Sequence, residues 1–143
     1  MRKKHKIKLV DALVAGNEVP IVKLNLNNTA YYALIDSGSA VNIAKETVLE
    51  KESIPFTVGK HKLIGLTGAT EQPLKQSLIQ SLRLNDYQFR QTDLWFILPE
   101  LSIPKAKLFS GEIASVDFIL GNDFLMAHKA VLDYKSRTLT FVA

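Results

Sequence analysis

The sequence contains no cysteine among its 143 residues, which excludes disulfide bonds and thiolate metal sites. Its three histidines, His5, His61 and His128, are scattered without the spacing of a zinc site, so we expect no metal and no cofactor. Long apolar runs are also missing, since none approaches the ~20 residues of a membrane-spanning helix. The basic start over residues 1–4 is followed by no continuous apolar segment of the signal-peptide kind. These absences favour a reducing compartment and no membrane partner.

Positive charge is concentrated at one end of the chain. The net charge is +4, and a large share of the positive charge comes from Arg2, Lys3, Lys4, Lys6 and Lys8. A basic cluster of this kind can contact nucleic acid or acidic lipid. Because no Phe, Tyr or Trp is interleaved with these residues, a platform for stacking bases is missing. We therefore interpret residues 1–8 as a solvated basic arm and expect no nucleic-acid partner.

The composition and periodicity indicate one domain, residues 1–143, built from short strands. Apolar residues make up 47% of the chain, enough for a single core. Pro99 and Pro104 interrupt regular structure, so residues 99–111 are expected to be irregular. The stretch 41–49 has mixed character, and a short helix over 44–49 is one alternative. Strands are expected over residues 6–13, 19–26, 29–35, 60–66, 74–84, 87–98, 113–120, 129–133 and 138–142, and a short helix over 122–128.

Two stretches carry the strongest functional signal. Residues 34–40 are the end of an apolar strand that stops abruptly in Asp36-Ser37-Gly38, where Gly38 permits a tight turn. Residues 118–125 are an apolar run that leads into Gly121 and then into a residue that can cap a helix. Taken alone, the first stretch is also typical of a strand followed by an ordinary polar turn.

Together, the two stretches resemble the retropepsin family of aspartic proteases, most closely the branch of pararetroviruses and long-terminal-repeat retrotransposons. The resemblance extends from about Ile21 to Phe141. It implies an all-β fold, a closed retropepsin-like acid-protease barrel with a β-hairpin flap and one short C-terminal helix. It also implies an aspartic endopeptidase that cleaves a viral or retrotransposon polyprotein, in the cytoplasm of the host cell or in the virus particle.

The resemblance assigns roles to individual positions. Asp36 is the implied catalytic acid, and Ser37 and Gly38 are the implied supports of its loop. A segment with two glycines three apart stands where the family has its flap, and such a segment can form a narrow tip. The implied substrate-binding residues are Ser39, Ala40, Gly65, Leu66, Thr67, Gly68 and Ile119. Leu120 and Gly121 are implied to pack behind the catalytic loop.

The number of catalytic motifs predicts the assembly. Asp-Ser-Gly occurs once, at Asp36, whereas the family's chemistry needs two facing carboxylates. A second copy must supply the other acid, so a homodimer acting on a peptide or polyprotein is expected. Compact retroviral members pair an Arg after the Ile-Leu-Gly-type motif with an Asp beyond the catalytic triplet. Here Asn122 and Ala40 hold those places, so no charge is stranded, but the dimer contacts must differ and we expect a weak dimer.

Other assignments of residues and functions are open but less supported. Asp117, Asp123 and Asp133 look structural, and Asp123 falls in the first turn of a helix, where negative charge is favourable. A serine nucleophile would need a histidine base and a Gly-x-Ser-x-Gly elbow, and the elbow is absent. Two further functions remain: a cellular retropepsin-like peptidase, and a non-catalytic dimerisation or peptide-binding module. The intact Asp-Ser-Gly triplet and flap glycines argue against the non-catalytic module.

Overall fold

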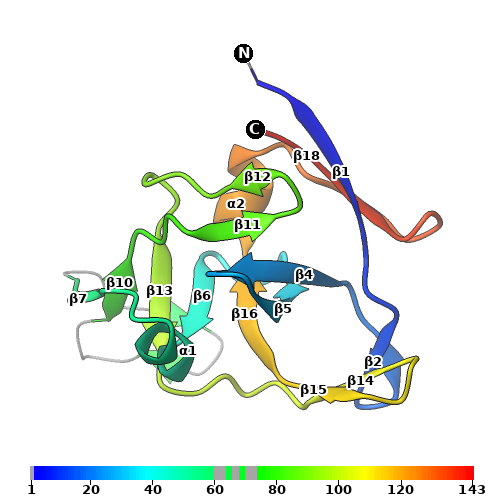
Figure 1. The fold of residues 1–143 in the computed structure, drawn as a ribbon, viewed down its shortest axis with the longest axis horizontal. Coiled ribbons are helices and arrows are strands. Elements are labelled where there is room, and N and C mark those ends of the chain that lie inside the picture. The colour runs from blue at the N-terminus through cyan, green and yellow to red at the C-terminus, as the bar shows by residue number, and fades with distance from the viewer. Residues whose placement is uncertain (1, 60–63, 66–67, 70–73) are drawn as a thin grey trace.

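The computed structural model describes residues 2–59, 64–65, 68–69 and 74–143 (Figure 1). The strands are β1 (Lys4–Lys8), β2 (Ala12–Val14), β3 (Asn17–Glu18), β4 (Ile21–Leu26), β5 (Thr29–Ile35), β6 (Asn42–Lys45), β7 (Thr57–Val58), β8 (Ile64–Gly65), β9 (Gly68–Ala69), β10 (Lys75–Ser77), β11 (Leu82–Leu84), β12 (Tyr87–Gln88), β13 (Trp95–Leu98), β14 (Ala106–Leu108), β15 (Ile113–Ala114), β16 (Val116–Leu120), β17 (Val131–Asp133) and β18 (Thr138–Val142). The helices are α1 (Glu46–Lys51) and α2 (Asn122–Ala127).

The predicted mostly β architecture is confirmed, and its centre is a curled nine-stranded sheet. The strand order is β12-β11-β4-β5-β16-β6-β13-β10-β7. The late strand β16 lies between β5, to which it runs parallel, and β6, to which it runs antiparallel (Figure 1). This crossing brings the end of β5 beside the end of β16. The two stretches singled out in the sequence therefore meet at one place in the fold.

The helical content differs from the single C-terminal helix that was predicted. Helix α2 is that predicted helix, whereas α1 is a second helix in the stretch whose sequence left helical and extended structure open. Helix α1 buries Val48 and Leu49 and exposes charged residues, a pattern that suits one turn and a half of helix against the sheet. Within the described ranges, neither helix has the length and apolar character needed to cross a membrane.

Alternation along the strands builds the main core. In β5, Tyr31, Ala33 and Ile35 are buried, and the two residues between them are partly exposed. Alternate residues of β4 and two residues of β16 are buried in the same core, namely Val22, Leu24, Leu26, Phe118 and Leu120. The largest fully buried side chains include Trp95, Phe118, Phe124 and Phe141. A smaller apolar cluster joins the strands β2, β14 and β15 to the large sheet.

The N-terminus forms a strand where a solvated basic arm was expected over residues 1–8 and a strand over residues 6–13. Residues Lys4–Lys8 form β1, which pairs antiparallel with β18, and both chain ends lie near each other (Figure 1). His5 and Ile7 alternate with the lysines and face the core, and the His5 ring stacks on Phe141 with centroids 5.0 Å apart. The apolar period of two explains why a lysine-rich segment is a strand here.

Regular structure is also found in the stretch 99–111 and in the expected flap region. The stretch 99–111 was expected to be irregular, but it contains β14, because Ala106 and Leu108 are buried in the smaller apolar cluster. The expected flap region contains a short antiparallel pair, β8 with β9, in which Gly65 is the register partner of Gly68. Residues 66 and 67, between these strands, lie outside the described residues.

Candidate active site

The carboxylate of Asp36 is held by the turn that follows it. β5 ends at Ile35, and Asp36, the next residue, is partly exposed. The backbone N–H of Gly38 donates to Asp36 Oδ1 at 2.9 Å, and the N–H of Ser39 donates to the Asp36 carbonyl oxygen at 3.1 Å. A Cβ atom on Gly38 would lie 3.1 Å from Asp36 Oδ1. Glycine at this position therefore keeps space next to the acid, and the turn orients one of its oxygens.

Backbone hydrogen bonds fasten this turn to the start of α2. The N–H of Asp36 donates to the Leu120 carbonyl oxygen at 3.0 Å. The N–H of Asn122 donates to the Ser39 carbonyl oxygen at 2.7 Å, and the N–H of Asp123 donates to the Ala40 carbonyl oxygen at 3.1 Å. The N–H groups of the first turn of α2, which have no partner within the helix, thus donate to the loop that carries Asp36. The loop that carries Asp36 is therefore hydrogen-bonded to the β16–α2 segment both before and after the Asp-Ser-Gly turn.

Gly121 is where the two segments cross most closely. A Cβ atom there would lie 2.0 Å from the Val41 carbonyl oxygen, so any side chain would clash with backbone. The N–H of Gly121 donates to Asn42 Oδ1 at 3.0 Å, and Asn42 is only 1% exposed. Asn42 was not among the site residues predicted from the sequence. Its signal was a polar residue in the otherwise apolar run Val41 to Ala44, because a buried amide needs a partner.

The predicted loop residues occupy different environments. Ser37 and Gly38 are exposed next to Asp36, and Ala40 is exposed as well. Ser39 is 4% exposed, and its hydroxyl donates to the Val41 carbonyl oxygen at 2.8 Å. Ser39 therefore stabilises the loop from within. Gly65 and Gly68 lie in the β8–β9 pair, while Leu66 and Thr67 lie outside the described residues, so the predicted roles of these four remain predictions.

Ile119 belongs to an apolar row that crosses the sheet. In the strand register, Ile119 is the partner of both Leu34 and Ile43, and Ile43 is the partner of Phe96. Register partners share one face of a sheet, so these four side chains are on one side. Phe118 and its partners pack into the main core on the other side. Ile43 and Phe96 were not among the predicted binding residues, although β-type periodicity could have placed Ile43 opposite the core.

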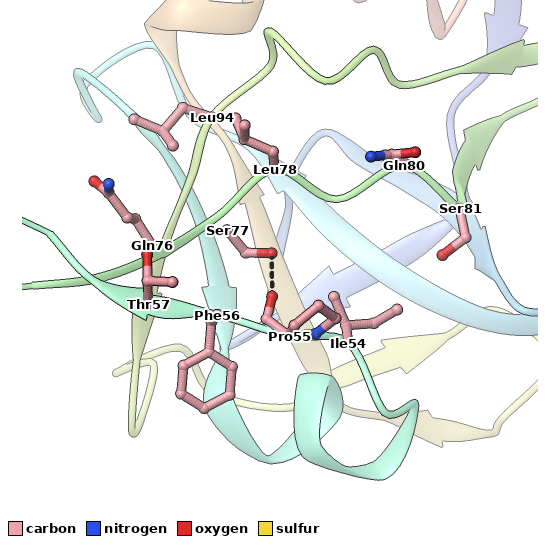
Figure 2. Close-up of a pocket in the computed structure, with 10 residues that line it drawn as sticks. All are labelled: Ile54, Pro55, Phe56, Thr57, Gln76, Ser77, Leu78, Gln80, Ser81 and Leu94. Carbon is pink, nitrogen blue, oxygen red and sulfur yellow. Dashed lines mark hydrogen bonds between the residues drawn. The ribbon is translucent and has the colours of Figure 1, made fainter.

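A separate pocket of about 450 Å³ lies beside α1, and none of the predicted site residues lines it (Figure 2). Its lining comes from residues 54–57, which lead into β7, from β10 and the segment after it, and from Leu94. The Ser77 hydroxyl donates to the Pro55 carbonyl oxygen at 2.8 Å and ties these two walls together (Figure 2). We therefore do not assign the Asp36 chemistry to this pocket. In the described part of the chain, no group of three or more His, Asp or Glu side chains is arranged to hold a metal ion.

Solved structures resemble this chain in fold. A retropepsin-like aspartic protease from Rickettsia conorii aligns with a TM-score of 0.59 and 15% identity, over 99% of this chain and 93% of that one. The retroviral protease-like domain of Ddi1 from Leishmania major aligns with a TM-score of 0.57 and 13% identity, over 94% and 89%. No protein-family model matches the chain, and no curated protein matches its sequence. The chain therefore has the fold of the retropepsin-like aspartic proteases.

Proposed function

We propose that the protein is an aspartic endopeptidase whose active unit is a homodimer. The observation that carries this proposal is the setting of Asp36. Its carboxylate is partly exposed, one oxygen accepts the Gly38 N–H, and its backbone is bonded to Leu120 within a retropepsin-like fold. An acidic residue in an ordinary surface turn would not need the buried segment around Leu120 and Gly121 to cross behind it.

The proposed chemistry uses two copies of Asp36 and one water. Two carboxylates at close range cannot both ionise, so the pair holds one proton. The ionised carboxylate accepts a proton from the water as its oxygen attacks the scissile carbonyl carbon, and the protonated one donates to the carbonyl oxygen. The carboxyl group that took the water's proton then passes it to the nitrogen while the other carboxylate takes a proton from a hydroxyl of the gem-diol, so the carbon–nitrogen bond breaks and the pair again holds one proton. The sequence contains Asp-Ser-Gly once, so each copy of the chain supplies one such acid, which supports a site shared between two copies.

The proposed substrate is an extended peptide with apolar side chains near the cleaved bond. The row of Leu34, Ile43, Phe96 and Ile119 supplies an apolar face on the side of the sheet opposite the main core. An extended peptide can bind as an added strand, with its alternate side chains in such pockets. The β8–β9 pair, in which Gly65 and Gly68 are register partners, supports a flap over the peptide. Ser39, Ala40 and the residues between these glycines complete the proposed binding set.

Two biological sources of the substrate are considered, a viral or retrotransposon polyprotein and a cellular protein. The Asp-Ser-Gly and Ile-Leu-Gly motifs support a polyprotein-processing enzyme of a virus or retrotransposon, which acts in the host cytoplasm or in the virus particle. A cellular retropepsin-like peptidase is the second candidate, and it is favoured by the two structural matches, which come from Rickettsia conorii and Leishmania major. The presence of a reverse transcriptase in the same reading frame would separate the two candidates.

The catalytic proposal is tested with Asp36→Asn, using Asp123→Asn as the matched control. Asp123 is exposed and lies in the same crossing, but its side chain is not needed for the proposed chemistry. Both variants and the wild type are incubated at mildly acidic pH with a mixture of peptides that have apolar central residues, and products are identified by mass spectrometry. We expect cleavage to fall by about 10²–10⁴-fold in Asp36→Asn and to persist in the control. Full cleavage by Asp36→Asn would overturn the mechanism.

A further inference from the structure

We propose that a basic groove beside β1 is a docking site for an extended acidic peptide segment of another protein. The groove has a volume of about 360 Å³ and lies between β1, the outer face of β4 and the turn before β12. Its lining residues are Lys6, Ile7, Lys8, Lys23, Asn25 and Asn85. None of the residues in the Asp36 site belongs to this lining. The proposal stands independently of the proposed protease activity.

The backbone of β1 is available for pairing along this groove. Lys3 and Ala143 exchange two backbone hydrogen bonds of 2.6 and 2.8 Å, and the Leu9 N–H donates to the Arg137 carbonyl oxygen. Because bonded and non-bonded pairs alternate in an antiparallel ladder, the odd-numbered residues of this segment point their backbone groups at β18. The even-numbered Lys4, Lys6 and Lys8 therefore point theirs away from β18. Among the described strands β18 is the sole partner of β1, so this edge is open.

The side chains around this open edge provide positive charge. Lys6, Lys8 and Lys23 are exposed, and none of them takes part in an ion pair found in the described part of the chain. The exposed Asp133 carboxylate, on the same three-stranded sheet, accepts the N–H groups of Ser136 and Lys135, and these bonds together with the nearby charge of Lys6 hold its pKa below the ordinary value. Lys6 is thus attracted to Asp133 but forms no ion pair with it, so the groove lysines can still meet an external anion.

The charge of the groove and the open edge of β1 together favour an extended acidic peptide as the ligand. A strand added to β1 would bond to the backbone of Lys6 and its even-numbered neighbours, and its alternate side chains would lie directly beside those lysines. Acidic side chains at those positions would be attracted, whereas a second copy of β1 would set lysine against lysine. Nucleic acid would gain the charge contacts but would not use a strand edge, and no aromatic side chain lines the groove for stacking. An extended acidic peptide uses both features.

The test uses a fluorescein-labelled eight-residue peptide that alternates threonine and glutamate. Binding is measured by fluorescence anisotropy, and amide exchange of β1 is followed by NMR. We expect the double variant Lys6→Glu, Lys23→Glu to weaken binding by about tenfold or more. The matched control Lys105→Glu, Lys107→Glu makes the same charge change at exposed positions outside the groove and should keep the wild-type affinity within about twofold. The peptide should also slow exchange of the Lys4, Lys6 and Lys8 amides.

Backbone pairing is tested with two further peptides of the same sequence, each N-methylated at every other residue, one at the threonines and one at the glutamates. Methylation removes the donors along one strand edge, so the peptide whose methyl groups face β1 should bind about tenfold more weakly and the other should bind as before. Equal weakening by the groove and control variants would overturn the proposal, since it would indicate diffuse charge attraction. Unchanged affinity of both methylated peptides would also overturn it, and tighter groove-dependent binding of a single-stranded oligonucleotide would favour nucleic acid instead.

Discussion

Asn42 and Gly121 are joined by a buried hydrogen bond in which the glycine N–H donates to the asparagine Oδ1 at 3.0 Å. Asn42 is 1% exposed, so water cannot replace either partner. The bond lies where the chain crosses behind the Asp36 turn, next to the 3.0 Å bond from the Asp36 N–H to the Leu120 carbonyl oxygen. The position of the candidate catalytic acid therefore depends on a side chain outside the Asp-Ser-Gly triplet.

Replacing Asn42 by leucine should destabilise the fold. The substitution keeps the approximate volume but removes the acceptor and leaves a buried N–H unpaired, which costs about 1–3 kcal/mol. Urea unfolding followed by tryptophan fluorescence measures the free energy, because Trp95 is fully buried in the core. The control Asn122→Ala, at an exposed position, should change it by about 0.5 kcal/mol or less. An equal decrease in the free energy of unfolding in the two variants would contradict a stabilising role of the buried hydrogen bond.

Gly121 should tolerate no side chain, for a reason other than backbone conformation. Its φ of −92° is accessible to any residue, but an added Cβ would lie 2.0 Å from the Val41 carbonyl oxygen. We expect Gly121→Ala to cost roughly 3 kcal/mol or more, or to prevent folding. Gly16→Ala is the contrasting control, because Gly16 has a φ of +80° with open space around it and should lose about 1–2 kcal/mol from backbone strain alone. Comparable unfolding free energies for the two variants would contradict the clash.

A buried network near the chain ends should make stability depend on acid pH. Burial alone would raise the pKa of Asp93, but hydrogen bonds from His128, Tyr87 and the Arg90 N–H outweigh it and hold that pKa below its ordinary value. Because the folded-state pKa is the lower one, the ionised side chain stabilises the fold above the unfolded-state value of about 4. This contribution is lost as the pH falls from about 4 through the folded-state pKa.

Thermal unfolding between about pH 7 and pH 2 tests this network. Asp93→Asn should be less stable than the wild type near neutral pH, by about 1–3 kcal/mol. The difference should shrink as the pH falls below about 4, because the wild type then loses the same charge. Asp86→Asn, at an exposed position, serves as the control for general charge effects. A difference between wild type and Asp93→Asn that stayed constant down to the lowest pH would contradict this account.

The parts of the site that were predictable from sequence are those that local backbone chemistry determines. The Asp-Ser-Gly turn needs Gly38 next to the acid, and the chain crossing needs Gly121. Each requirement is therefore visible as a glycine within a short sequence motif. The strands β4 and β5 were predictable because apolar alternation persists over five or more residues in each, and β16 because it is a short, mostly apolar run that ends at a glycine. The C-terminal helix was predicted where it occurs, but Gly121 is its N-cap and no side chain caps it, so the expected capping side chain is not part of the helix start.

The parts that were missed depend on partners far away in the chain. Asn42 is 79 positions from Gly121, and His128 is 35 positions from Asp93, so neither pairing has a local signature. The strand β1 was predicted only in part, since the expected strand over residues 6–13 overlaps its end but not its beginning, and charge alone does not show that β18 pairs with a lysine-rich segment. Likewise β14 forms in a proline-interrupted stretch because β2 and β15 offer edges to pair with. Tertiary partners decided these elements more than intrinsic propensity did.

The proposed sharing of one active site by two copies of the chain can be tested by mixing variants. If each site needs Asp36 from two copies, mixing equal amounts of wild type and Asp36→Asn should leave about a quarter of the activity of the same total concentration of wild type, because only one random pair in four has both acids. Independent monomers would retain about half, since each wild-type chain would act alone. The measurement is the cleavage rate of an apolar-junction peptide after the chains have been allowed to exchange, with Asp123→Asn mixed in the same way as the control for a correctly folded partner. Activity that falls in simple proportion to the wild-type fraction would contradict a site shared across the two-fold axis, even if Asp36 itself proved essential.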